Sequence, residues 1–118
     1  MAFTAGIPIY DASVTGVTEL LQTGYTILES AEVENINTTP VYLQLFDAAA
    51  TTDVTLGTTT PTDTRMIPAG AGTPNNTARL FGNDIRRRFG AGIVYAITTT
   101  RSGSTSPATA CPVNFVIS

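Results

Sequence analysis

Three consecutive arginines at positions 86–88 form the densest group of charged side chains in this chain. They lie in the segment GNDIRRRFGAG, residues 82–92, and make up half of the basic residues, all of which are arginine. A guanidinium group presents a rigid fork of N–H donors that binds carboxylates and phosphates. Arg86, Arg87 and Arg88 are therefore candidates for partner contact. Three interpretations stay open: an acidic protein surface, nucleic acid, or a solvated connection between strands.

The carboxylates are weaker candidates for chemistry. Glu32 and Glu34 are two residues apart, so on a strand they share one face. A glycosidase-like pair would also need a cleft and a raised pKa on one member, and the pattern favours two solvated acids on an open face. Asp47 and Asp53 flank the loop DAAATTD, which offers too few carboxylate ligands for calcium. We expect no metal site from either group.

Missing residue types exclude several catalytic arrangements. The chain has no histidine, no lysine and one cysteine, Cys111. Zinc sites, Ser-His-Asp or Cys-His groups within one chain, and a lysine-containing phosphate loop are therefore ruled out. Cys111 has no partner for an internal disulfide, and the apolar residues around it predict a buried thiol. We expect a protein that is not an enzyme and that needs no cofactor.

The charge balance narrows the range of partners. The formal net charge is −3, and only 13% of the residues are charged. Coating nucleic acid or anchoring to an anionic membrane would need a broad basic surface, and no apolar run approaches the ~20 residues of a membrane span. The N-terminus lacks the pattern of a secretory signal, so the N-x-T sites at Asn37 and Asn75 are not expected to carry sugar. Neither nucleic acid nor membrane is an expected partner.

Short strands are the elements predicted to position these residues. Apolar side chains alternate along many segments, threonine is abundant, and no helical period persists for two turns. A chain of 118 residues is the size of one domain. The pattern predicts an all-β fold, an antiparallel β-sandwich (Ig-like or jelly-roll-like) of about seven or eight short strands. The predicted strands are 18–23, 24–36, 41–47, 54–61, 64–70, 77–82, 91–100 and 111–118.

The alternation also predicts which side chains face the core. In the segment 24–36, Ile27, Ala31 and Val33 are predicted to share the core face. The same spacing places Leu28 on the opposite face.

The first sixteen residues show no sustained period. We therefore predict an extended N-terminal arm over residues 1–16, followed by a single sandwich domain over residues 17–118. Two interpretations of the arm stay open: a frayed terminus, or an arm that docks on a neighbouring subunit because large apolar groups are poorly placed in free solvent. Its candidate interface residues are Phe3, Ile7, Ile9 and Tyr10.

From residue 41 onward the sequence resembles a small β-sandwich domain that recurs in structural proteins of tailed bacteriophages. The resemblance covers roughly two-thirds of the chain. It is specific to a fold family and not to one role in the virion. The region from Ile85 to Ile93 departs from the family's compact IRF-x-x-G-I form by carrying additional arginines. The matching segments are VYLQLFDAA (41–49), VTLGTTTPT (54–62), IPAG (67–70) and GIVYAITTTRSGSTSP (92–107).

The resemblance implies a structural role in a virion. Stand-alone domains of this size are similar to capsid cement or decoration proteins, which sit on the outer surface of the head and stabilise it by bridging major capsid protein subunits. The implied partners are the major capsid protein and further copies of the chain. By analogy a trimer is favoured, and a dimer is the other option. The protein would be made in the host cytoplasm and end on the capsid surface.

Two other functions remain open from the sequence. The same domain family occurs in neck, tail and fibre components of virions. A carbohydrate-binding host-attachment module is a third option, although the chain has no tryptophan for stacking against a sugar or base.

Overall fold

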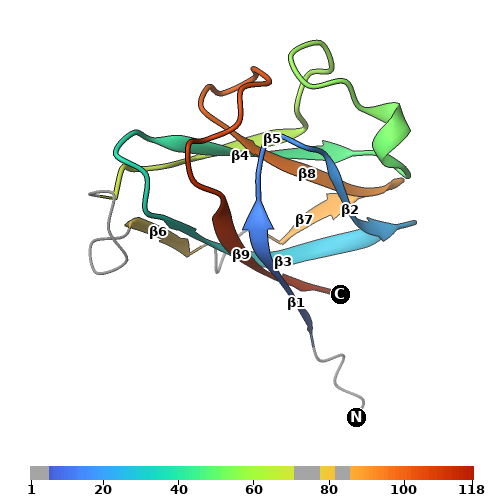
Figure 1. The fold of residues 1–118 in the computed structure, drawn as a ribbon. Helices are drawn as coiled ribbons and strands as arrows, with labels where there is room; N and C mark the ends of the chain where they lie inside the picture. Colours follow the sequence, from blue (N-terminus) through green and yellow to red (C-terminus); the bar gives the residue numbers. More distant parts are fainter. Residues whose placement is uncertain (1–5, 71–77, 82–85) are drawn as a thin grey trace.

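Two antiparallel sheets pack face to face in the computed structural model, which describes residues 6–70, 78–81 and 86–118 (Figure 1). The all-β sandwich predicted from the sequence is confirmed. Sheet A contains β1 (Ile7–Val14), β9 (Cys111–Ile117) and β3 (Thr26–Asn35), with β6 (Ala78–Phe81) and β7 (Arg87–Phe89) both paired to β3. Sheet B contains β2 (Glu19–Thr23), β8 (Gly92–Thr98), β4 (Val41–Asp47) and β5 (Asp63–Ile67).

The strand order is that of a jelly roll. Within the described residues, β1 pairs with β9, β2 with β8, β3 with β6 and β7, and β4 with β5, as if one long hairpin had been rolled up. The first four strands alternate between the two sheets. An immunoglobulin-type sandwich would instead keep its first two strands in one sheet. β6 and β7 share one position of the roll, because they pair with successive stretches of β3.

The core lies between the sheets and is built from alternate residues of the central strands. This alternation is clearest in β9, whose buried residues Cys111, Val113, Phe115 and Ile117 match the pattern of the sequence. The Tyr95 and Phe115 rings, one from each sheet, pack with their centroids 4.7 Å apart. The largest buried side chains of this core include Leu28, Leu43, Leu45, Ile67, Phe89, Ile93, Ile97 and Phe115.

A β-bulge in β3 reverses the predicted facing of some of its side chains. The register between β3 and β9 shifts between Leu28 and Ser30, so one extra residue is inserted there. Leu28 is fully buried and Ile27 is only partly buried, which reverses the faces expected from strict alternation. Ala31 and Val33 lie on the core face as predicted. The extra residue also leaves Glu29 at the surface.

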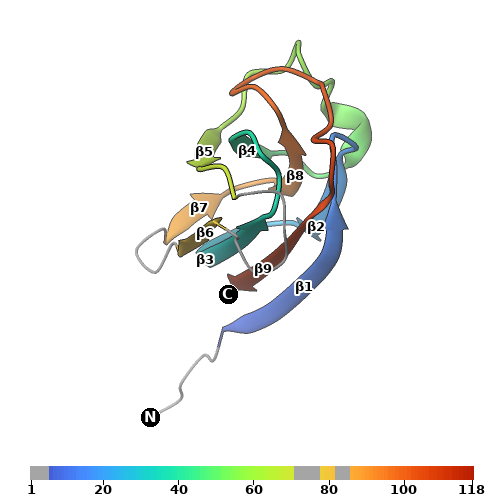
Figure 2. The ribbon, with the colours of Figure 1, turned by 60° about the vertical axis from the view of Figure 1, so that its left-hand side comes forward.

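The N-terminal segment is extended, and much of it belongs to the sandwich. Residues 7–14 form β1, an edge strand of sheet A that pairs with β9 and lies beside it in Figure 2. The boundary predicted at residue 16 therefore does not separate an arm from the domain in this region. The strand carries two features typical of protected edges, namely Pro8 and a register shift between Asp11 and Val14.

Loops cover part of the outer face of sheet B, and the side chains beneath them form a second, smaller core. Phe46 and Val94 point away from the main core and pack with Ala48, Val54 and Leu56. The strand expected over 54–61 is absent, because this segment is a turn-rich loop that follows a short 3-10 helix, η1 (Thr51–Asp53). Gly57, with a φ of 84°, breaks the extended conformation there.

A hydrogen bond between the sheets ties β8 to β1. The Tyr95 hydroxyl donates to Asp11 Oδ2 at 2.7 Å. Burial, and then the bond to Asp11, raise the pKa of Tyr95 well above its ordinary value of 10.0. Because the folded-state pKa is raised, this stabilisation is fully present below pH ~10 and is lost as pH rises above it.

We therefore expect the Tyr95→Phe variant to be about 1–2 kcal/mol less stable at neutral pH. At pH values between the pKa of Tyr95 in the unfolded state and that in the folded state, its contribution to the free energy of unfolding of the wild type falls by about 1.4 kcal/mol per pH unit. The Tyr95→Phe variant lacks this pH dependence. Urea unfolding of both proteins across a pH series measures the difference. Parallel pH profiles for the two proteins would contradict the assignment.

Candidate interaction surface

The three arginines of the run point in different directions because they enter a strand. Arg86 has a φ of 29°, a left-handed conformation rare for residues other than glycine, and it leads directly into β7. Successive residues of a strand face opposite sides. Arg87 lies opposite Leu28, a core residue, whereas Arg88 lies opposite Ile27 on the outer side of sheet A. The run is therefore divided between two faces.

Arg87 contributes to an ion-pair group at the rim between the two sheets. Its Nη1 lies 4.0 Å from Asp63 Oδ2 on β5. The same oxygen accepts hydrogen bonds from Arg65 Nη2 at 3.0 Å and Arg65 Nε at 3.2 Å. Among the described residues, two guanidinium groups thus share one carboxylate. The contact also links the edge strands of sheets A and B.

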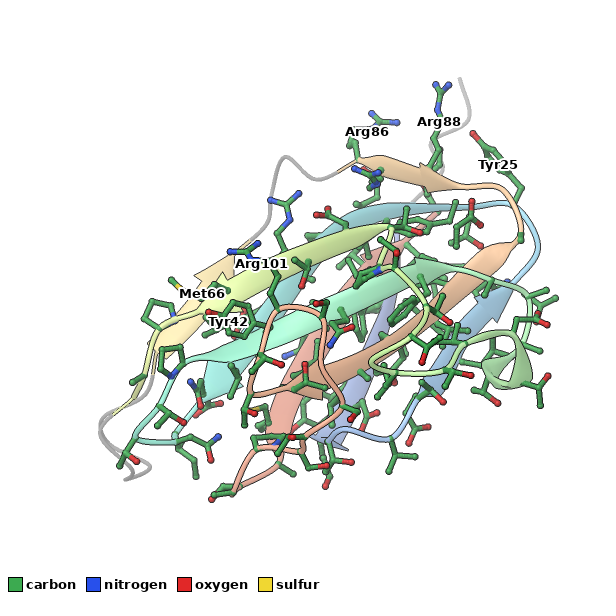
Figure 3. The ribbon with its side chains drawn as sticks, turned by 90° about the horizontal axis from the view of Figure 1, so that it is seen from above. Tyr25, Tyr42, Met66, Arg86, Arg88 and Arg101 are labelled. Carbon is green, nitrogen blue, oxygen red and sulfur yellow. The ribbon has the colours of Figure 1, made fainter. Side chains whose placement is uncertain are left out.

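Arg86 and Arg88 project from the β7 edge toward solvent. Arg86 Nε lies 3.5 Å from Glu29 Oε2, and most of its side chain remains exposed. Arg88 is exposed and makes no ion pair with any described residue. Figure 3 shows Tyr25 projecting near Arg88 at the same edge, and this tyrosine is 63% exposed. Tyr25, Arg86 and Arg88 together are called the β7 surface below.

The turn after β7 is held by a carboxylate of the other sheet. Asp47 Oδ1 accepts a hydrogen bond from Ala91 N at 2.8 Å, and Asp47 Oδ2 accepts one from Gly90 N at 3.2 Å. Phe89 is fully buried just before this turn. The β7 surface is therefore presented by a short strand anchored at its C-terminal end. Asp47, which we considered as a calcium ligand, has this structural role.

The apolar candidates of the N-terminal segment differ in their surroundings. Ile9 is partly buried and packs against the main core. Ile7 and Tyr10 are more than half exposed on β1. Phe3 lies outside the described residues. Ile7, Ile9 and Tyr10 lie on β1, at the edge of sheet A opposite to β7.

A second exposed group, which the sequence did not single out, lies over sheet B. The Arg101 guanidinium is 5.5 Å from the centre of the Tyr42 ring, within the range of a cation–π contact. Met66 is the register partner of Tyr42 on β5 and is 46% exposed. Figure 3 shows these three side chains close together. Tyr, Met and Arg are enriched at protein interfaces.

Hydrogen bonds from sheet B fix the loop that carries Arg101. Gln44 Nε2 donates to Gly103 O at 3.0 Å, Thr98 Oγ1 donates to Thr100 O at 2.7 Å, and Thr64 Oγ1 donates to Arg101 O at 3.0 Å. Gln44 and Thr98 are fully buried. The threonine-rich loop, whose role was not evident from composition, therefore presents Arg101 from a fixed position.

The described residues show no arrangement typical of a metal or nucleophile site. No group of three or more potential metal ligands occurs among them. Cys111 is buried as predicted, and burial raises the pKa of its thiol to about 11 despite a hydrogen bond from Asn37. A thiol with so high a pKa is protonated at neutral pH and is a poor nucleophile. Glu32 and Glu34 lie on the partly exposed face of β3.

Comparison with known proteins finds no matching family model, no matching curated protein and no matching solved structure. The resemblance to phage structural domains therefore rests on the sequence segments alone. The described part of the chain also contains no helix long and apolar enough to cross a membrane.

Proposed function

We propose that this chain is a viral structural protein of the capsid cement or decoration type. It binds the outer surface of a tailed-phage head, bridges neighbouring major capsid protein subunits and stabilises the shell. The observation that carries this proposal is the β7 surface, an exposed basic edge on a domain whose net charge is −3. Such an edge fits an acidic protein partner.

The geometry of the β7 surface supports protein contact over nucleic-acid contact. Of its two arginines, Arg86 is partly neutralised by Glu29, and only Arg88 lacks a carboxylate among the described residues. Binding to nucleic acid requires several phosphate contacts. One unpaired arginine beside an exposed tyrosine instead matches the composition of protein interfaces. The resemblance of residues 41–107 to phage structural domains points to a virion protein as that partner.

Copy number separates this proposal from the leading alternative, a neck, tail or fibre component. Quantitative mass spectrometry of purified virions gives the ratio of this chain to the major capsid protein. A cement protein is expected to be present at a ratio of the same order as the capsid subunit. A ratio typical of tail or neck proteins, with only a few copies per virion, would overturn the proposal in favour of the alternative.

The two neighbouring arginines provide a matched test of the contact. We expect Arg88→Ser to weaken binding to capsids stripped of this protein by about two- to fivefold at low salt, the range of an exposed ion pair. The Arg87→Ser variant removes the same charge from a side chain directed toward Asp63, so it should bind nearly as the wild type does.

Salt gives a second measure of the same contact. The difference between wild type and Arg88→Ser should shrink as salt is raised, because exposed charges are then screened over about 8 Å or less. Equal losses for Arg87→Ser and Arg88→Ser at every salt concentration would mean that only net charge matters. The β7 surface would then not be the contact.

A further inference from the structure

The two margins of sheet B carry opposite charges and exposed apolar side chains. β2 forms one edge of this four-stranded sheet and β5 forms the other. The margin at β2 carries Val17, Glu19 and Leu20, and we call it the acidic margin. The margin at β5 carries Tyr42, Arg65, Met66 and Arg101, and we call it the basic margin.

The acidic margin is unusually apolar for an exposed edge. Val17 is 62% exposed and Leu20 is 44% exposed. Glu19 is exposed between them and makes no ion pair with a described residue. The adjoining edge strand of sheet A, β1, contributes Asp11, and neither β1 nor β2 contains an arginine. This side of the molecule therefore presents negative charge together with aliphatic surface.

The basic margin has the complementary character. Arg65 shares Asp63 with Arg87, so the described residues of the β5 rim carry two guanidinium groups for one carboxylate. Arg101 makes no ion pair with a described residue, and its guanidinium lies over the Tyr42 ring. Met66 supplies exposed apolar surface between these cations. A partner for this margin must offer a carboxylate next to an aliphatic side chain.

On both margins a charged side chain faces the sandwich side and an apolar side chain faces the outer side. Glu19 lies opposite Tyr95 of the main core, so it faces the sandwich side, whereas Leu20 lies opposite Val94 on the outer side. On β5, Arg65 lies opposite Leu43 on the sandwich side, whereas Met66 lies opposite Tyr42 on the outer side. When Glu19 lies opposite Arg65 on one side, Leu20 and Met66 are diagonal neighbours on the other side, a distance that long side chains can span.

Strand direction is also compatible with this contact. Every neighbouring pair in sheet B is antiparallel, and the sheet has four strands, so β2 and β5 run in opposite directions. Two copies placed side by side in the same orientation would bring β5 of one next to β2 of the other as antiparallel neighbours. A two-fold contact of β5 with β5 would instead bring like charges together.

We propose that the protein self-associates head to tail, with the basic margin of one copy against the acidic margin of the next. The occupant of each margin is thus a second copy of this chain. Contacts of this heterologous kind produce a closed ring when the rotation between copies closes. The inference does not depend on a virion role, because it uses neither the β7 surface nor a capsid partner.

Charge placement on the outer side of each margin tests this directly. Leu20→Arg puts a cation on the outer side of the acidic margin, where it would face Met66 and Arg101 of the next copy. Met66→Glu puts an anion on the outer side of the basic margin, where it would replace the apolar contact with Leu20 and add to the negative charge of the acidic margin. Each single variant is expected to weaken self-association about tenfold, measured by sedimentation over a concentration series. Both sites are exposed, so circular dichroism should show an unchanged fold.

Recombining the two changes distinguishes head-to-tail from two-fold contact. The double variant Leu20→Arg/Met66→Glu, and an equimolar mixture of the two single variants, should both recover association, because cation then meets anion across the contact. Arg88→Glu is the control, and it should self-associate as the wild type does while binding capsids more weakly. A monomeric wild type at all concentrations, or no recovery in the double variant and the mixture, would overturn the proposal.

Discussion

Replacing Gly92 with alanine is expected to destabilise the fold by about 3–5 kcal/mol, a large part of the stability of a typical domain. Gly92 begins β8 with a φ of 142°, a conformation that side chains rarely adopt. An added Cβ would also collide with Gln22 O and would lie 2.7 Å from Ala48 O. Both obstacles are backbone atoms of neighbouring segments, so neither moves without breaking sheet B.

Gly24 provides the matched control for this prediction. Its φ is 91°, but nothing lies within 4 Å of an added Cβ. Gly24→Ala therefore isolates the conformational penalty, which is about 1 kcal/mol. Thermal or urea unfolding of both variants separates the two contributions. Similar losses for the two glycines would show that the contact of Gly92 with the Gln22 and Ala48 carbonyls is easily relieved.

Replacing Asn35 with aspartate is expected to have an effect of similar size. Asn35 is fully buried at the end of β3, and its Nδ2 donates to Thr39 O at 3.1 Å and to Pro68 O at 2.9 Å. Its Oδ1 accepts from Asn37 N and from Asn37 Nδ2. Aspartate has the same shape but would direct an acceptor at two carbonyl oxygens. We expect a loss of about 3–5 kcal/mol at neutral pH.

The pH dependence of this variant gives the prediction a second test. Burial raises the pKa of a carboxyl in the folded state, so the loss should shrink as pH falls toward the unfolded-state value of about 3.9. Asn114→Asp is the control, because Asn114 is exposed on β9. Equal stability of the two variants at neutral pH would mean that the Asn35 network contributes little. The network also explains why Asn37, an N-x-T residue, offers no accessible amide.

The central strands were predictable because each is a short run of mostly apolar residues bounded by turn signals. β4, β8 and β9 follow their predicted ranges closely. Prediction failed where the sheet departs from strict alternation. The bulge at Glu29 depends on pairing with β9, a strand about 85 residues away. The local periodicity of the sequence therefore does not predict it. The segment 54–61 has strand-forming threonines, but the fold uses it to cover Phe46 and Val94.

The candidate surfaces were also only partly predictable from the sequence. The arginine run was visible because its charge is concentrated in sequence, but its division between two faces follows from β7, which we had not predicted. The group of Tyr42, Met66 and Arg101 was invisible because three separate segments supply it. Only the strand order of sheet B brings them together.

The pairing of β1 with β9 has a consequence for synthesis. A ribosome releases the chain from the N-terminus onward, and residues 7–14 emerge long before their partner strand at 111–117 has been made. Sheet A therefore cannot be completed until almost the whole described chain is outside the exit tunnel. Until then β1 has no strand to pair with. Folding of this domain is accordingly expected to finish only after residues 111–117 have emerged, and a chain truncated before residue 111 should fail to acquire a stable fold.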